Sequence, residues 1–230
     1  EIMGRNSGWL TLAAGLEHFM GGVYPQIVAI PEIPFDEFGF LNQVKELLKT
    51  EHTVICAVSE GIRNHNGDYV GMETKSGAVD TFGHTYLSGV GKYLELQIAE
   101  KIGCKVRSIE LNVMQRCSAH LASKTDLDEA VQIGEAAVSA AEAGATGIMM
   151  VFERTSNHPY AVRIAQTDVS NVANLAKDVP ECWHDLSDQS VRDEIKQYLL
   201  PLMQGELEPI RDKTGLPVFL DIRGIHSTRE

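Results

Sequence analysis

The sequence is poor in the features that mark membrane, secreted or metal-binding proteins. No apolar run approaches the length of a membrane span, and we expect neither a membrane anchor nor a signal peptide. The 4 cysteines show no paired spacing, so we expect no disulfide scaffold and a reduced, cytoplasmic setting. The 8 histidines include no helical ligand pair, and we expect no metal site such as zinc in this chain.

Basic residues are also scarce. The chain has 20 Lys and Arg against 32 Asp and Glu, a formal net charge of -12. This balance argues against nucleic acid as a partner, because nonspecific binding to nucleic acid needs a basic face. An anionic substrate would have to be captured by a local arginine cluster against the overall field. Arginines in loops are therefore the first candidates for a binding site.

The periodicity of the sequence predicts alternating strands and helices. The expected helices cover residues 9–20, 37–49, 90–102, 125–143 and 190–203; the expected strands cover 26–30, 53–58, 106–113, 147–152 and, more loosely, 160–169. This alternation indicates a layered α/β fold with a largely parallel sheet flanked by helices. In such folds ligands collect at the carboxyl ends of the strands.

Capping and turn residues refine these expectations. Asp36 and Thr125 are expected to cap the helices that follow them, because a side-chain oxygen there accepts from the first free amides. Asn6-Ser7 is expected to cap the helix that begins near Gly8. Asn66-Gly67 predicts a hairpin turn with positive φ at both residues.

The first candidate site is Met3-Gly4-Arg5. Ile2-Met3 would close a strand, Gly4 would let the backbone approach a ligand, and Arg5 would offer a planar donor fork to a phosphate. The helix start that follows would present free amides to an anion. The alternative is an ordinary strand–turn–helix joint with a solvent-facing arginine.

Two further strand ends carry suitable chemistry. Glu60 follows a buried strand and could accept hydrogen bonds from sugar hydroxyls, although it could equally be a plain strand-terminal acid. Arg107 and Arg116 bracket the expected strand of residues 106–113, with Asn112 and Gln115 between them. Both arginines could bind phosphate in bidentate fashion, or form surface salt bridges.

Taken in order, several motifs resemble the phosphofructokinase family, and most closely its bacterial pyrophosphate-dependent type (diphosphate–fructose-6-phosphate 1-phosphotransferase). They are EIMGRNSGWLTLAAGL, PEIPFD, CAVSEGI, GVGKYLE, KVRSIELNVMQRC and PLMQGE. The likeness runs from Glu1 to about Pro217, and residues 218–230 would form a tail. MGR and the Gln-Arg pair are general to the family, whereas ELNVMQRC and PLMQGE are similar to one subgroup.

The resemblance implies roles for the residues that match. Met3, Gly4 and Arg5 would contact fructose 6-phosphate, and Arg5 would also stabilise the transferred phosphoryl group as the catalytic arginine. Glu60 would bind sugar hydroxyls, and Arg116 would close on the substrate. Arg107 would reach the 6-phosphate of a neighbouring subunit's substrate, which implies a homo-oligomer with shared sites.

The stretch before Arg116 departs from the family pattern. Val113, Met114 and Gln115 would also line the substrate, but many relatives carry His or Tyr where this chain has Val113. A valine side chain donates no hydrogen bond. Either this subgroup uses backbone contacts there, or phosphate affinity rests more heavily on Arg107 and Arg116.

The resemblance also implies a missing half. In the family, the phosphate-donor loop, the Thr-x-Asp segment with the catalytic base and the acids that hold Mg²⁺ precede MGR, and residues 1–217 would be the fructose 6-phosphate-binding region. The implied activity is phosphorylation of the 1-hydroxyl of fructose 6-phosphate in glycolysis, with pyrophosphate as donor. This chain alone would be inactive. The alternatives are an ATP-dependent 6-phosphofructokinase or a noncatalytic, regulatory sugar-phosphate-binding subunit.

Overall fold

The computed structural model describes residues 1–71 and 89–219, and shows a mixed α/β chain. The α-helices are α1 (Trp9–Ala14), α2 (Leu16–Phe19), α3 (Glu37–Leu47), α4 (Val90–Lys101), α5 (Asn112–Cys117), α6 (Lys124–Glu142) and α7 (Gln189–Leu199). The strands are β1 (Ile27–Ala29), β2 (Cys56–Val58), β3 (Ile148–Asn157) and β4 (Tyr160–Asp168). Short 3₁₀ turns cover Ala119–Leu121, Val169–Asn171, Glu181–Trp183 and Leu200–Met203.

A parallel sheet positions the candidate site. β1 and β2 pair in parallel, with Ile27 opposite Cys56. On the other edge of β2, Ile2 forms a parallel bridge with Ser59: its N–H donates to the Val58 carbonyl at 2.8 Å, and its carbonyl accepts from the Glu60 N–H at 2.9 Å. The carboxyl ends of the Ile2 segment and of β2 therefore meet at one edge, as expected for a ligand site in this fold class.

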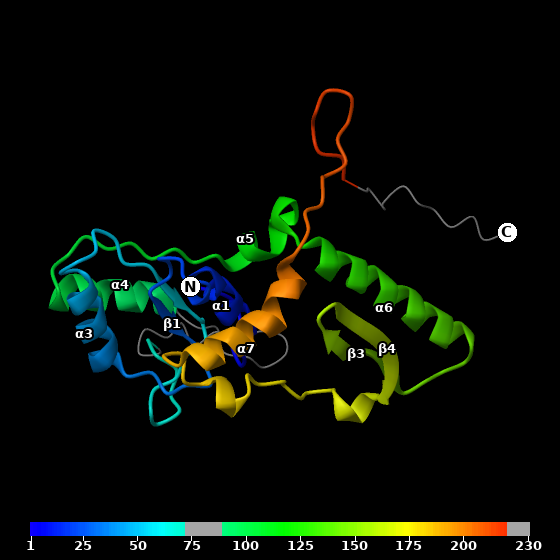
Figure 1. Ribbon diagram of the computed structural model, residues 1–230, viewed down its shortest axis with the longest axis horizontal. Helices are drawn as coiled ribbons and strands as arrows, with labels where there is room; N and C mark the ends of the chain where they lie inside the picture. Colours follow the sequence, from blue (N-terminus) through cyan, green and yellow to red (C-terminus); the bar gives the residue numbers. More distant parts are fainter. Residues whose placement is uncertain (72–88, 220–230) are drawn as a thin grey trace.

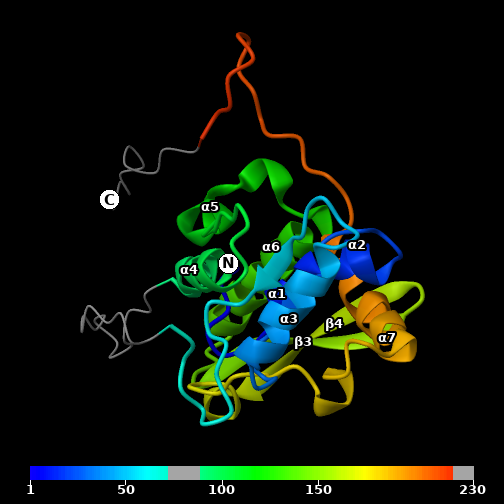
Figure 2. The same cartoon turned by 90° about the vertical axis from the view of Figure 1, so that its left-hand side faces the viewer.

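Helices cover both faces of this sheet and enclose two apolar clusters (Figures 1 and 2). One cluster joins the sheet to α3 and α4; its buried members are Ile27, Phe35, Phe40, Leu41, Val44, Val58, Ile62, Val90, Leu94 and Ile98. The other joins α1, α2 and α7; its buried members are Leu12, Leu16, Phe19, Ile30, Val179, Trp183, Ile195 and Leu199. The α/β layering predicted from the sequence is thus confirmed.

Residues 99–178 are less buried than the rest of the described chain. β3 and β4 form an antiparallel hairpin, and α6 lies beside it at the right of Figure 1. Every one of residues 99–178 keeps some exposure, and none is buried. The expected strands at 147–152 and 160–169 therefore pair with each other, because their short connection permits an antiparallel ladder and not a parallel one.

The strand expected at residues 106–113 is wrong. Residues 103–111 belong to no helix and to no ladder among the described residues, and α5 begins at Asn112. Leu111 already has helical backbone angles (φ -65°, ψ -39°), and Asn112 has a left-handed φ of 42°, so the backbone around the expected end of the strand is not extended. Arg107 and Arg116 thus lie on an irregular segment and on a helix, and do not bracket a strand.

Several local expectations also change. The helix expected at 9–20 is two short helices that meet at Gly15. Asp36 occupies the N-cap position of α3 in extended backbone, but its side chain makes no capping hydrogen bond. Of Asn66-Gly67, only Gly67 has positive φ (82°), because the Asn64 side chain accepts from the Asn66 N–H at 2.9 Å and shapes the turn.

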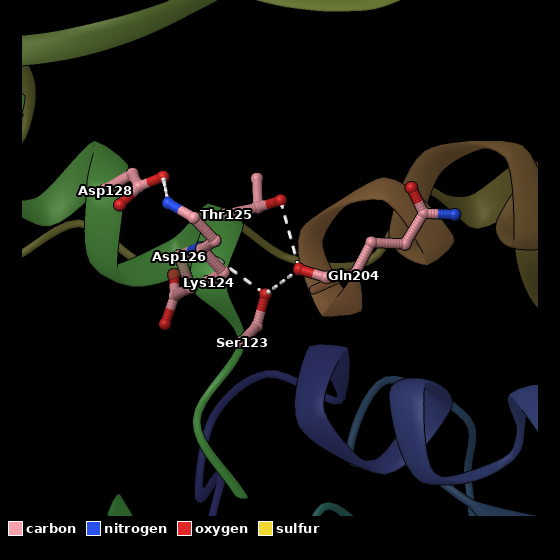
Figure 3. Close-up of polar contacts among 6 residues, drawn as sticks. All are labelled: Ser123, Lys124, Thr125, Asp126, Asp128 and Gln204. Carbon is pink, nitrogen blue, oxygen red and sulfur yellow. Dashed lines mark hydrogen bonds and ion pairs between the residues drawn. The ribbon is translucent and has the colours of Figure 1, made fainter. Parts of the chain in front are cut away.

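The cap of α6 is Ser123, not the predicted Thr125. The Ser123 hydroxyl accepts from the Asp126 N–H, and both the Ser123 and Thr125 hydroxyls donate to the Gln204 carbonyl, at 3.1 and 3.2 Å (Figure 3). The Lys124 and Thr125 N–H groups donate to the carbonyls of Gly205 and Gln204. The start of α6 is therefore sealed by the PLMQGE segment, which lies about 80 residues away in the sequence.

Candidate functional site

The site is built around the backbone of Gly4. The Gly4 N–H donates to Glu60 Oε1 at 3.1 Å, and the Gly4 carbonyl accepts from the Ser59 hydroxyl at 2.5 Å. Ser59 is fully buried, whereas Glu60 is half-buried. Two consecutive residues at the end of β2 therefore hold both polar backbone groups of Gly4.

Helix α5 approaches the same segment from the other side. Gln115 Oε1 accepts from the Met3 N–H at 3.0 Å, and Arg116 Nε lies 3.4 Å from Met3 Sδ. These contacts join residues that are more than 110 positions apart in the sequence. The structure thus brings Met3, Gly4, Glu60, Gln115 and Arg116 into one cluster.

Two glycines make this close packing possible. Gly4 has a φ of 138°, and a Cβ at this position would lie 2.7 Å from the Ser7 carbonyl oxygen. A Cβ on Gly61 would lie 1.8 Å from the Arg5 carbonyl oxygen, a distance no side chain tolerates. Only glycine at position 61 therefore allows the Arg5 backbone to pass so close to the end of β2.

The charged groups of the cluster, and Arg5 next to it in the chain, keep unused hydrogen-bonding capacity. The Arg5 side chain is half-buried and donates no hydrogen bond to the described residues. Arg116 is exposed and uses only Nε, on a sulfur atom, and Glu60 uses only Oε1. Guanidinium groups bind phosphate oxygens, and a carboxylate accepts from hydroxyls, so this arrangement suits a ligand that carries both.

Three of the predicted residues lie outside this cluster. Val113 and Met114 are on α5 with 63% and 57% of their surface exposed, and no polar contact joins them to the Gly4 segment. Arg107 lies on the extended segment before α5, where it lines a cavity of about 820 Å³. This cavity adjoins the site at Ile2, but Met3, Gly4 and Arg5 are not among its lining residues.

Sequence reasoning missed two residues that organise the site. Ser59 precedes Glu60 directly, and a small hydroxyl at the end of a buried strand was the available signal. Glu32, in the PEIPFD motif, accepts from the N–H groups of Gly8 and Val179 through Oε1, both at 2.9 Å. Gly8, and not Asn6 or Ser7, occupies the N-cap of α1. The expected helix start is therefore held by the chain's own carboxylate.

Burial and neighbouring charges shift the pKa of Glu1, the acid beside the site. Burial raises the pKa of Glu1, and the nearby carboxylates of Glu110 and Glu60 act in the same direction, while the hydrogen bond from the Gly91 N–H opposes them.

No group of three or more His, Cys, Asp or Glu side chains within residues 1–71 and 89–219 could hold a metal ion. In the same ranges, no helix has the length and apolar character needed to cross a membrane.

The parallel sheet, with Arg5 and Glu60 at its carboxyl edge, is an α/β framework for a ligand site, and the comparison with known families identifies the family. The family model described as Phosphofructokinase matches residues 1–141, and the chain belongs to this family. The predicted resemblance is confirmed.

Within the family, the chain is similar to proteins named pyrophosphate–fructose 6-phosphate 1-phosphotransferase. It is 34% identical to one from Xanthomonas campestris pv. campestris over 225 residues, which cover 98% of this chain and 53% of that protein. It is 36% identical to one from Halomonas elongata, over 94% of this chain and 51% of that protein. The chain thus spans about half the length of the curated relatives it matches.

Solved structures agree with these sequence comparisons. A crystal structure of a pyrophosphate-dependent phosphofructokinase from Nitrosospira multiformis superposes with a TM-score of 0.77 at 32% identity, over 95% of this chain and 50% of that chain. A second crystal structure of a pyrophosphate-dependent phosphofructokinase, from Marinobacter aquaeolei, superposes with a TM-score of 0.73 at 28% identity, over 94% of this chain and 50% of that chain. The fold described above is therefore shared with pyrophosphate-dependent phosphofructokinases.

Proposed function

We propose that the longer protein to which this chain belongs transfers a phosphoryl group from pyrophosphate to the 1-hydroxyl of fructose 6-phosphate, and that this chain supplies the sugar-phosphate side. The product is fructose 1,6-bisphosphate. One observation carries the proposal: Met3 and Gly4 are held by Glu60, Gln115 and Arg116 in a chain 34% and 36% identical to two proteins of that name.

Glu60, Arg116 and Arg5 have different proposed roles. Glu60 keeps Oε2 to accept from a sugar hydroxyl, since its Oε1 is occupied by the Gly4 N–H. Arg116 offers its terminal nitrogens to the 6-phosphate. Arg5 follows the clamped Gly4 directly, and its guanidinium stabilises the charge that develops on the transferred phosphoryl group. Phosphoryl transfer depends mainly on positioning and electrostatics, so a rigid Gly4 backbone favours it.

The donor side lies outside the described residues of this chain. We infer that the longer protein uses a divalent metal, Mg²⁺, which would neutralise charge on the pyrophosphate when bound. The described residues contain no group of three or more His, Cys, Asp or Glu side chains that could hold it. The base that takes the 1-hydroxyl proton would also come from another part of the longer protein.

Arg107 has a different proposed role. It is exposed, lies outside the Gly4 cluster, and donates no hydrogen bond to a described residue. We infer that it reaches the 6-phosphate bound by a neighbouring copy, so that the active protein is a homo-oligomer with shared sites. Replacement of Arg107 by Ala should then raise the KM for fructose 6-phosphate without breaking the Met3–Gln115 contact.

The donor assay tests the function directly. The longer protein, purified with Mg²⁺, should form fructose 1,6-bisphosphate from fructose 6-phosphate with pyrophosphate and not with ATP. Turnover with ATP alone would overturn the donor assignment. If neither donor reacts but calorimetry detects fructose 6-phosphate binding, the chain is part of a noncatalytic sugar-phosphate-binding subunit.

A matched pair of arginine variants tests the site. Arg116→Ala should raise the KM for fructose 6-phosphate at least about 10-fold, because a hydrogen bond to a charged group contributes about 1.5–3 kcal/mol. Arg163→Ala is the control, since Arg163 lies on the hairpin and pairs with Glu153 at the surface. An unchanged KM in Arg116→Ala would exclude this arginine from the site.

A further inference from the structure

Helix α5, which carries Arg116, is connected to the rest of the described chain at both of its ends. At its start, the Leu111 N–H donates to the Glu1 carbonyl at 3.2 Å. At its end, a short connection of residues 118–122 leads to Ser123, the N-cap of α6. Ser123 lies where the PLMQGE segment seals the start of α6 (Figure 3). The position of Arg116 therefore depends on two separate anchors.

The connection between α5 and α6 is held by its own hydrogen bonds. The Ser118 hydroxyl donates to the Met114 carbonyl at 2.7 Å, and the Leu121 N–H donates to the Ser118 carbonyl at 2.9 Å. These bonds fold the connection into tight turns, of which one is a 3₁₀ turn. A displacement at the start of α6 is therefore passed on to α5 and is not absorbed between the two helices.

Main-chain carbonyls form the second anchor. The Gln204 carbonyl accepts from the hydroxyls of Ser123 and Thr125 at 3.1 and 3.2 Å, and from the Thr125 N–H at 3.3 Å. The Gly205 carbonyl accepts from the Lys124 N–H at 3.1 Å. The side-chain amide of Gln204 points away from these donors (Figure 3). The anchor is thus set by the backbone of two residues.

The backbone of this anchor admits only glycine at its second residue. Gly205 has a φ of 82°, and a Cβ at this position would lie 2.8 Å from the Cβ of Lys124. Neither atom can rotate away, because a Cβ is fixed by its own backbone. A side chain at position 205 would therefore push the start of α6 away from the anchor.

The anchor follows a helix that is packed in the core. Residues 204 and 205 come directly after the 3₁₀ turn at the end of α7, and Ile195 and Leu199 of α7 are buried in the cluster with α1 and α2. None of residues 99–178, which include α5 and α6, is buried. The anchor is therefore a point at which this exposed part of the chain is held against the core.

We propose that the Gln204-Gly205 backbone and the Ser123 hydroxyl position Arg116 and thereby help to set the affinity for fructose 6-phosphate. The inference rests on the proposed function, in which Arg116 binds the 6-phosphate. These are positioning residues, because they have no polar contact with the Gly4 cluster and act through the connection between α5 and α6. A binding group that is held in place before the ligand arrives loses less entropy on binding.

Two glycine variants at opposite ends of α6 test the proposal in the longer protein. Gly205→Ala should raise the KM for fructose 6-phosphate at least about 5-fold, because it displaces the start of α6 and with it Arg116. The kcat should change less than about 2-fold, since the backbone around Gly4 is not moved.

Gly144→Ala is the matched control for this variant. Gly144 has a φ of 84°, and no atom lies within 4 Å of the added Cβ. Both variants carry the strain of a side chain at positive φ, but only Gly205→Ala moves Lys124. An unchanged KM in Gly205→Ala, or an equal rise in both variants, would overturn the proposal.

Variants of Ser123 test the same anchor without backbone strain. Ser123→Ala removes the hydroxyl that accepts from the Asp126 N–H and donates to the Gln204 carbonyl, and it should raise the KM about 3-fold or more. Ser123→Thr keeps a hydroxyl and should restore most of the affinity. A hydroxyl that only capped α6 would lower the thermal stability of Ser123→Ala and leave the KM unchanged, which would contradict the proposal.

Calorimetry with fructose 6-phosphate separates failure of this inference from failure of the proposed function. If the wild type binds the sugar phosphate but does not react with pyrophosphate, only the function is rejected, and the Kd replaces the KM in the same comparisons. If the wild type reacts while the variants of Gly205 and Ser123 keep its KM, only the inference is rejected. A wild type that does not bind fructose 6-phosphate would reject both.

Discussion

The Ser59 hydroxyl donates a hydrogen bond of 2.5 Å to the carbonyl of Gly4, and Ser59 is fully buried. The next residue, Glu60, accepts from the Gly4 N–H. Arg5 follows Gly4 in the chain, so the end of β2 fixes the backbone from which its guanidinium projects. The stability of this junction and the proposed chemistry are therefore coupled through one glycine.

Removal of the Ser59 hydroxyl should destabilise the protein. Ser59→Ala leaves the Gly4 carbonyl without its buried partner, and we expect a loss of about 1–2 kcal/mol in the free energy of unfolding, measured by urea denaturation. Ser139→Ala is the matched control: its exposed hydroxyl donates to the Glu135 carbonyl within α6, and its loss should change stability by less than about 0.5 kcal/mol. If Ser59→Ala and Ser139→Ala lowered the free energy of unfolding equally, the Ser59 hydrogen bond would not specifically stabilise the Gly4 segment.

Gly61 should tolerate no side chain. In Gly61→Ala the new Cβ would meet the Arg5 carbonyl at 1.8 Å, and the backbone must shift at a cost of about 3 kcal/mol or more. Gly134→Ala, on α6 with no atom within 4 Å of the added Cβ, should instead stabilise the protein by about 0.5–1 kcal/mol. Thermal unfolding of both variants distinguishes these opposite signs, and a stable Gly61→Ala protein would disprove the close approach.

Gln115 should act through Met3. Gln115→Leu removes the acceptor of the Met3 N–H and should raise the KM for fructose 6-phosphate about 10-fold, since an unpaired donor costs about 1–3 kcal/mol. Gln115→Glu keeps an acceptor oxygen at the same place and should restore most of the affinity. If Gln115→Glu were as impaired as Gln115→Leu, the amide itself would contact the substrate and the positioning role would be wrong.

Arg5 should contribute to turnover more than to binding. Arg5→Ala in the longer protein should lower kcat about 100-fold or more with little change in the KM for fructose 6-phosphate, because the contact strengthens as charge develops. Arg5→Lys keeps the charge but loses the planar guanidinium fork, so its kcat should lie between that of the wild type and that of Arg5→Ala. A change confined to KM would contradict the role assigned to this residue.

Glu95 should make stability depend on pH. Hydrogen bonds from Lys92 and from Ser108 lower the pKa of Glu95 to about 2. An acid whose pKa is lowered by folding stabilises the protein above its unfolded pKa, about 4.3, and this contribution disappears as the pH falls toward 2. Wild type should therefore exceed Glu95→Gln in stability at pH 6, and the difference should shrink between pH 5 and pH 3. A constant difference would argue against the linkage.

Local patterns in the sequence predicted most of the elements. The helices at 37–49, 90–102 and 125–143 and the buried strands at 26–30 and 53–58 follow from apolar periodicity, and the structure confirms each, apart from some residues at the ends. The Ser123 cap was missed because serine and threonine both cap helices, so residue type alone did not exclude Thr125. Only the contact with Gln204, far along the chain, shows which one begins α6.

The remaining errors concern pairing partners. Residues 106–113 alternate like a strand, but a strand forms only where a neighbour pairs with it, and among the described residues only Glu1 does so. The candidate site shows the same limit. The residues Gly4, Glu60 and Arg116 were predicted one by one, whereas the Gln115 bond to Met3 spans 112 positions and depends on the whole fold. The placement of Val113 and Met114 beside the substrate remains a prediction.

Helix α5 belongs to the long stretch of residues 99–178 in which no side chain is buried. Polar contacts of Gln115 and Arg116 with Met3, and the backbone hydrogen bond from Leu111 to Glu1, hold α5 against the amino-terminal segment. A hinge at this point would open no void in either apolar cluster. Substitutions in α5 should therefore change how tightly Arg116 holds the proposed sugar phosphate while the thermal stability of the protein stays almost unchanged.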